Sequence, residues 1–188
     1  YKDMGVQEVV WEEANPEVYG ELLENLQIMN ISEVQSHPYN QLISDKDDVE
    51  LDFNLYYGWD AGHLVGNKGM SSLLKARNSW WGSDCYKGTI ELNSLTVDTF
   101  LERNDIDNSF DMMNIDTQGA ELMVFKGATE VLKKIEVINC EVTFFNPQYH
   151  DNPNFDEVYG YLKEFGFKHV HTDYCLEGNW GDAVFVKE

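Results

Sequence analysis

The sequence predicts a single α/β domain built on a mainly parallel, doubly wound sheet. Its 188 residues, 43% of them hydrophobic, suffice for one packed core but not for two comfortable domains. Apolar strand patterns alternate with helical patterns along the chain, as expected for parallel strands joined by helices. In addition, one apolar run ends abruptly in a carboxylate, a glycine turn and a helix, which is a common arrangement at the ligand-binding edge of such sheets.

The first elements follow from local pattern. Residues 6–13 read as a short strand with an apolar centre, and Asn15 followed by Pro16 is a preferred helix start. Apolar residues at helical spacing extend this helix to about Gln27. A second strand is expected at residues 40–44. Alternating residues predict antiparallel strands at residues 49–56 and 89–92.

The later elements return to alternating helices and strands. Helical spacing recurs from Phe155 to Phe165, and Gly166 is a suitable helix stop. The other helices are expected at residues 96–103 and 119–134, and the other strands at 110–115, 135–142, 167–172 and 182–186.

The run from Phe110 to Ile115 ends in Asp116, and Gln118 and Glu121 follow at the start of the next helix. In open α/β sheets, ligands bind outside the carboxyl ends of the strands. The three polar side chains therefore form a candidate site for catalysis and binding. The alternative is that Asp116 only caps the helix, because Asp is favoured at that position.

Two further carboxylates follow earlier strands. Glu13 precedes the first helix, where an acidic residue can accept hydrogen bonds from both hydroxyls of a nucleotide ribose. Asp45 ends the second predicted strand and could accept from an exocyclic amine such as that of adenine. The competing interpretations are a solvated strand end for Glu13 and a charged turn for Asp45.

Glu141 lies inside an apolar strand pattern, where a carboxylate is costly unless it is paired or faces a cleft. It could act as a base or hold a substrate hydroxyl, or it could be a salt-bridged structural residue. Trp80 and Trp81 could stack on a sugar or another ring, or could pack beneath their loop.

The charge balance limits the possible partners. With 34 acidic and 13 basic residues, the formal net charge is −21, which opposes binding to nucleic acid or to anionic membranes. Three widely spaced cysteines without a CxxC pair argue against a zinc site or a disulfide scaffold, so we expect a reduced, cytoplasmic setting. His169 and His171 lack an evident third ligand, and no metal is predicted.

Together these segments resemble the FkbM family of S-adenosylmethionine-dependent methyltransferases, in order and over nearly the whole chain. The most specific match is Phe110-Asp-Met-Met-Asn-Ile-Asp-Thr-Gln-Gly-Ala-Glu-Leu122. The supporting matches are Glu12-Glu-Ala-Asn-Pro16, Leu42-Ile-Ser-Asp45, Met70-Ser-Ser-Leu73, Leu95-Thr-Val-Asp98, Ile138-Asn-Cys-Glu-Val142 and Gly181-Asp-Ala-Val-Phe-Val186.

The resemblance implies a Rossmann-like class I methyltransferase fold with an antiparallel last strand, and O-methylation of a hydroxyl on a sugar, a glycan or a small natural product. It implies that Glu13 and the adjoining Asn15 contact the cofactor, with Glu13 on its ribose and Asp45 near its adenine. Asp116, Gln118 and Glu121 would line the junction of cofactor and substrate. Asp116, or less readily Glu141, would take or orient the hydroxyl proton.

The family's first strand and its glycine-rich cofactor loop have no counterpart here, so we expect them upstream of Tyr1. That strand would lie between the strands that end at Glu13 and Asp116. Two other functions remain open: a binding domain of the same fold that lacks catalysis, and a nicotinamide-dependent oxidoreductase. The second lacks a dinucleotide loop and a Tyr-x-x-x-Lys pair in the sequence.

Overall fold

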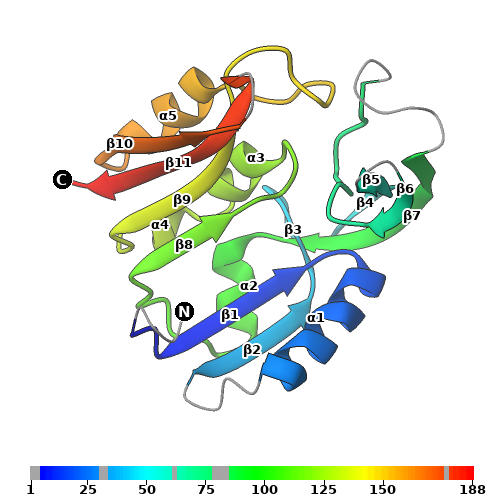
Figure 1. The fold of residues 1–188 in the computed structure, drawn as a ribbon. Coiled ribbons are helices and arrows are strands. Elements are labelled where there is room, and N and C mark those ends of the chain that lie inside the picture. Colours follow the sequence, from blue (N-terminus) through cyan, green and yellow to red (C-terminus); the bar gives the residue numbers. More distant parts are fainter. Residues whose placement is uncertain (1–4, 30–33, 61–62, 78–84, 176–177) are drawn as a thin grey trace.

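The computed structural model describes residues 5–29, 34–60, 63–77, 85–175 and 178–188 (Figure 1). The helices are α1 (Pro16–Met29), α2 (Val97–Arg103), α3 (Glu121–Lys126), α4 (Thr129–Leu132) and α5 (Phe155–Lys163). The strands are β1 (Glu8–Glu13), β2 (Gln35–Asn40), β3 (Leu42–Ile43), β4 (Val49–Tyr56), β5 (Gly58–Asp60), β6 (His63–Asn67), β7 (Tyr86–Leu95), β8 (Met112–Ile115), β9 (Val137–Thr143), β10 (Phe167–Tyr174) and β11 (Trp180–Lys187). Trp80 and Trp81 lie outside these described residues.

The C-terminal half forms a four-stranded sheet in the order β10-β11-β9-β8. β8 and β9 are parallel, with Ile115 opposite Cys140, so their carboxyl ends reach the same edge. β11 runs antiparallel to both of its neighbours, β9 and β10, which confirms the expected direction of the last strand. This sheet brings the residues that follow β8 next to those near the end of β9.

The N-terminal half holds smaller sheets. β1 pairs in parallel with β2, and the three-stranded sheet has the order β3-β7-β4, with β4 and β7 antiparallel as predicted. Among the described residues, β1 and β8 do not pair with each other, although their arrowheads point the same way in Figure 1. The described strands therefore form four separate sheets, of which two combine parallel and antiparallel pairs, and the single doubly wound parallel sheet is not confirmed.

The second strand was predicted at the wrong place. The pairing with β1 involves residues 35–40, and only Leu42 and Ile43 of the predicted segment form a strand, which pairs with β7 instead. Polar residues and Pro38 hide β2 in the sequence. Among the described residues β2 pairs with β1 alone and is an edge strand, which is the position where sheets tolerate proline.

The long helix predicted over residues 119–134 is also wrong, because α3 and α4 are separate. Gly127 lies so close to β3 that a side chain there would meet the carbonyl oxygen of Ser44. Asp98 of α2 then caps the new helix start, since its carboxylate accepts hydrogen bonds from the backbone N–H groups of Glu130 at 2.9 Å and Val131 at 3.2 Å. Contacts from distant segments therefore decide this break.

The main hydrophobic core lies where the C-terminal sheet meets α2, α3, α4 and α5. Its fully enclosed side chains include Phe100, Phe125, Leu132, Ile138, Leu162 and Phe185. In the part of the chain that the structure describes, no helix is both long enough and apolar enough to cross a membrane.

Replacing Gly127 by alanine should destabilise the fold. A Cβ atom at this position would lie 2.3 Å from the backbone oxygen of Ser44, and that oxygen cannot move without shifting β3. We expect Gly127→Ala to lower the free energy of unfolding by roughly 1–3 kcal/mol in urea denaturation. Gly160→Ala is the matched control, because nothing lies within 4 Å of its added Cβ in α5. It should leave stability unchanged or raise it by up to about 1 kcal/mol. Equal effects of the two changes would contradict the close approach.

Candidate active site

The turn between β8 and α3 carries the centre of the candidate site. Gln118 has a φ of 54° and Gly119 a φ of 96°, so two successive residues adopt left-handed backbone conformations. For a residue other than glycine this conformation costs on the order of 1 kcal/mol or more, and it persists only where the surroundings enforce it. Here the hydroxyl of Ser72 donates to the carbonyl oxygen of Gln118 at 2.7 Å. The turn is therefore held from a segment 46 residues away.

The side chain of Gln118 joins two carboxylates. Its amide nitrogen donates to Oδ1 of Asp116 at 2.6 Å and to Oε2 of Glu141 at 3.2 Å. Asp116 follows β8 and Glu141 belongs to β9, and these adjacent parallel strands bring the two carboxylates together. Three residues that the sequence predicted for catalysis and substrate binding thus form one hydrogen-bonded group.

Burial and neighbouring charge change the protonation of this group. The pKa of Glu141 is raised well above its ordinary value, first by burial and then by the negative charges of Asp116 and Glu121. A hydrogen bond with Asp116 raises the pKa of Glu141 further. At neutral pH, Glu141 is therefore the partner that carries a proton, and Asp116 is the more exposed of the two.

Glu121 is buried and supports the turn. Its Oε1 atom accepts hydrogen bonds from the backbone N–H groups of Thr117 at 3.1 Å and Gly119 at 2.9 Å. Its side chain is only 3% exposed, and burial raises its pKa to about 7. The observed contacts give Glu121 a structural role, while its role toward substrate stays a prediction.

Glu13 and Asn15 lie where β1 passes into α1. Oε1 of Glu13 accepts from the backbone N–H of Asn15 at 2.7 Å, which orients the carboxylate. The pKa of Glu13 is raised by burial and, to a smaller extent, by the charge of Asp116, so the ends of β1 and β8 are electrostatically coupled. Asn15 is 2% exposed, and its Oδ1 atom caps α1 by accepting from the N–H of Glu17 at 3.0 Å. The predicted contact of Asn15 with the cofactor stays a prediction.

Asp45 follows β3 and carries an unsatisfied acceptor. Its Oδ1 atom is buried and has no hydrogen-bond partner among the residues that the structure describes. A buried acceptor without a donor typically costs about 1–3 kcal/mol, which a ligand that supplies an N–H group would recover. The position is therefore suited to an amine donor such as the one that the sequence analysis assigned to it.

The sequence analysis missed Tyr149, which is 1% exposed and lies in the loop between β9 and α5. Its hydroxyl lies 2.7 Å from the carbonyl oxygen of Met70 and 3.0 Å from Oε1 of Gln118. The surrounding residues Asn146, Pro147 and Gln148 read as an ordinary polar loop, so no local pattern points to a buried tyrosine in contact with the site.

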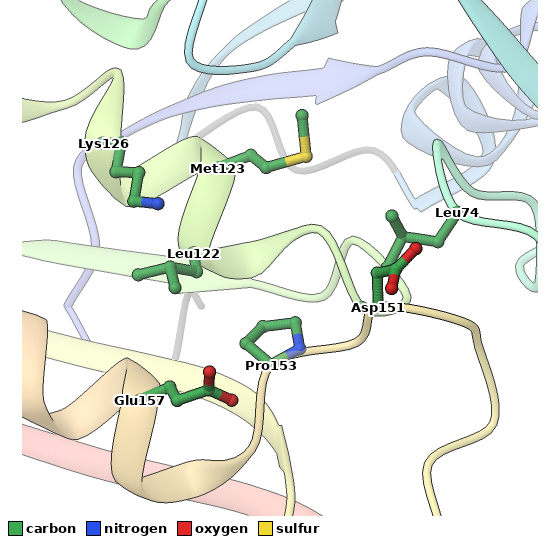
Figure 2. Close-up of a pocket in the computed structure, with 8 residues that line it drawn as sticks. Leu74, Leu122, Met123, Lys126, Asp151, Pro153 and Glu157 are labelled. Carbon is green, nitrogen blue, oxygen red and sulfur yellow. The ribbon is translucent and has the colours of Figure 1, made fainter.

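A pocket of about 180 Å³ lies beside the turn (Figure 2). It opens between α3 and the start of α5, and Lys126, Asp151 and Glu157 contribute its polar groups. Gly119 contributes to its wall, but Asp116, Gln118 and Glu141 do not line it. This pocket therefore adjoins the carboxylate group without containing it.

The buried carboxyl of Glu121 should make stability depend on pH. Because the pKa of Glu121 is about 7 in the folded protein and its ordinary value is 4.5, the folded state binds the proton more tightly. Stability is full below pH 4.5 and falls as the pH rises through 7, by up to about 3 kcal/mol. Glu121→Gln keeps the acceptor oxygen and cannot ionise. Urea denaturation from pH 4.5 to 8 should show the variant gaining stability relative to the wild type as pH rises, whereas a constant difference would contradict the assignment.

Comparison with known proteins identifies the family. The profile described as Methyltransferase FkbM domain matches residues 1–169, which include β1, the turn at Asp116 and the loop that carries Tyr149. Searches of curated proteins and of solved structures returned no significant match. The match covers most of the chain and includes every described residue of the carboxylate group. The chain therefore belongs to the FkbM methyltransferase family.

Proposed function

We propose that the protein transfers a methyl group from S-adenosylmethionine to a hydroxyl oxygen. The observation that carries the proposal is the pair formed by Asp116 and Glu141, joined by Gln118 at the ends of two adjacent parallel strands. A hydroxyl is a weak nucleophile until its proton is removed or oriented, and a carboxylate at hydrogen-bonding distance performs that task. Membership of a methyltransferase family supports this choice of reaction.

The two acidic strand ends on the N-terminal side suit the nucleoside part of the cofactor. The carboxylate of Glu13, oriented by the N–H of Asn15, would accept hydrogen bonds from the ribose hydroxyls. The Oδ1 atom of Asp45 is buried and has no hydrogen-bond partner among the described residues. It would accept a hydrogen bond from the adenine amine. When bound, the cofactor supplies an electrophilic methyl group on a positively charged sulfur.

The two carboxylates have different tasks in this mechanism. Glu141 holds a proton at neutral pH because burial and the charge of Asp116 raise its pKa. Asp116 is exposed and accepts a hydrogen bond from Gln118, so it is the group that takes the proton of the acceptor hydroxyl. Divergent environments in a pair of carboxyl groups typically separate an acid from a base in this way. Most of the remaining acceleration would come from alignment of donor and acceptor.

The acceptor proposed is a hydroxyl of a sugar, a glycan or a small natural product. The net charge of −21 and the carboxylates at the site disfavour anionic acceptors. Trp80 and Trp81, which lie outside the described residues, are the candidates for stacking on its ring.

The proposal also includes a further parallel strand between β1 and β8. Within the described ranges, β1 pairs only with β2, and β8 pairs only with β9, so each strand has an edge without partners. Unpaired backbone groups at a sheet edge are suited to receive another strand.

Removal of the Asp45 carboxylate should weaken cofactor binding. In calorimetric titration of the intact protein with S-adenosylhomocysteine, Asp45→Ala should raise the dissociation constant by about tenfold, the value of one hydrogen bond to a buried acceptor. Asp52→Ala is the control, because this exposed carboxylate lies on β4. If the two variants bind S-adenosylhomocysteine equally tightly, the adenine contact is contradicted. If the wild type gives no heat of binding, the cofactor assignment itself is contradicted.

Variants of the two carboxylates should differ in activity. Asp116→Asn should lower the rate of methyl transfer by about 10²–10⁴-fold, because it removes the proton acceptor. Glu141→Gln should retain activity within about tenfold, because its amide can still donate a hydrogen bond to Asp116. The measurement is transfer of labelled methyl to a panel of monosaccharides and their glycosides. Full activity of Asp116→Asn, or equal losses in the two variants, would contradict these roles.

A further inference from the structure

Two loops near the carboxylate group are joined to each other by backbone hydrogen bonds. The segment Tyr149–His150 of the β9–α5 loop runs beside the segment Lys75–Arg77, with an antiparallel bridge between Ala76 and Tyr149. The backbone N–H of Arg77 donates to Gln148 at 2.8 Å, and that of His150 donates to Lys75 at 2.8 Å. These two backbone hydrogen bonds, which make up the bridge, fix the position of the Tyr149 main chain.

The Tyr149 ring is fixed as well. It packs in a small buried cluster with Tyr56 and Met70, and its ring lies edge-on to that of Tyr56 at 6.3 Å. The hydroxyl has a single proton and faces two carbonyl-type oxygens, those of Met70 and of the Gln118 side chain. The hydroxyl is therefore held at one place beside the Gln118 amide, where it can donate its proton to Oε1 of Gln118.

When the Tyr149 hydroxyl donates to the Gln118 amide, it favours one of the two orientations of that amide. A glutamine amide can rotate by 180°, which exchanges an acceptor oxygen for a donor nitrogen. Toward Tyr149 the amide presents oxygen, and toward Asp116 and Glu141 it presents nitrogen. The reverse orientation would place the amide oxygen against two carboxylates and would lose both hydrogen bonds. The tyrosine hydroxyl thus favours the one orientation in which the amide supports the carboxylate pair.

We propose that Tyr149 is a positioning residue whose hydroxyl orients Gln118, so that the amide holds Asp116 and Glu141 side by side. The inference rests on the proposed function, because it assigns Tyr149 to the same site. Tyr149 acts through Gln118 and does not touch the reacting atoms. The main chain of Gln118 is held separately by Ser72, so loss of the tyrosine hydroxyl releases the amide without opening the turn.

Positioning of the Gln118 amide by Tyr149 should affect the pH at which Glu141 titrates. The acidic groups that act on it are Asp116 after β8, Glu121 in α3 and Asp182 on β11, and burial adds to their effect. The Gln118 amide opposes them, because a donor stabilises the ionised carboxylate. When the amide is no longer oriented, this donation weakens, and the midpoint for Glu141 moves to higher pH.

Tyr149→Phe and Tyr56→Phe form a matched pair of variants. Each removes one hydroxyl from the same buried cluster. The Tyr56 hydroxyl, however, accepts from the backbone N–H of Ala76 at 2.9 Å and, within the described residues, makes no hydrogen bond to Gln118. Carboxylate ¹³C NMR of the intact protein measures the Glu141 midpoint directly. Tyr149→Phe should raise it by roughly half a unit to one unit. Tyr56→Phe should leave it unchanged, with a comparable loss of thermal stability.

A double-mutant cycle tests whether the effect passes through Gln118. Gln118→Ala alone should raise the Glu141 midpoint, and adding Tyr149→Phe should cause no further change. An unchanged midpoint in Tyr149→Phe, an equal change in Tyr56→Phe, or a Tyr149→Phe effect that persists in the Gln118→Ala background would each overturn the inference. If Tyr149→Phe does not fold, an unchanged midpoint in Gln118→Ala overturns it.

Activity separates this inference from the proposed function. In methyl transfer assays, Tyr149→Phe should lower kcat and shift the alkaline limb of the rate profile to higher pH, with KM for S-adenosylmethionine within about twofold of the wild type. If the midpoint shifts as expected while the wild type transfers no methyl group, the positioning role stands and the proposed function fails. If the wild type transfers methyl groups and the midpoint does not shift, the reverse holds.

Discussion

The arrangement of two carboxylates around one glutamine amide is the constraint on which the site depends. The charge of Asp116 opposes ionisation of the buried Glu141, so the pair is favoured when Glu141 holds a proton and a donor lies between the two groups. Gln118 supplies that donor through hydrogen bonds of 2.6 and 3.2 Å to Asp116 and Glu141. The left-handed backbone of Gln118 is the cost of placing the amide there.

The rest of the structure maintains this arrangement. The parallel strands β8 and β9 place the two carboxylates at one edge of the sheet. Glu121 and Ser72 form hydrogen bonds with the backbone of the turn, and the Tyr149 hydroxyl contacts the Gln118 amide. The contacts of Ser72 and Tyr149 with Gln118 join segments that are distant in sequence. The contact of Glu121 with Gly119 is local, and it pairs two buried polar groups. Such groups are stabilising only as a complete network, because every missing member leaves a buried polar atom unsatisfied. This explains why one short turn engages residues from three separate parts of the chain.

Local patterns in the sequence predict part of this account. Asp116 and Glu141 could be proposed because each follows or interrupts an apolar strand, and the antiparallel pairing of β4 and β7 follows from alternation. The break at Gly127 could not be predicted, because it depends on the carbonyl of Ser44 and the distant cap from Asp98. Tyr149 was missed for the same reason: its burial and its contact with Gln118 arise only when two loops meet. Likewise β2 is specified by its pairing with β1, since its own residues carry no strand pattern.

The central claim is that Glu141 carries a proton at neutral pH while it lies beside Asp116. Isotope-edited infrared spectroscopy of the protein with ¹³C-labelled carboxyl groups tests it directly, because a protonated carboxyl has a carbonyl stretch that an ionised one lacks. We expect such a band at pH 8, where Glu121, with a pKa of about 7, is largely ionised. The band should be lost in Glu141→Gln and retained in Glu121→Gln. Absence of the band from the wild type, or its persistence in Glu141→Gln, would contradict the claim.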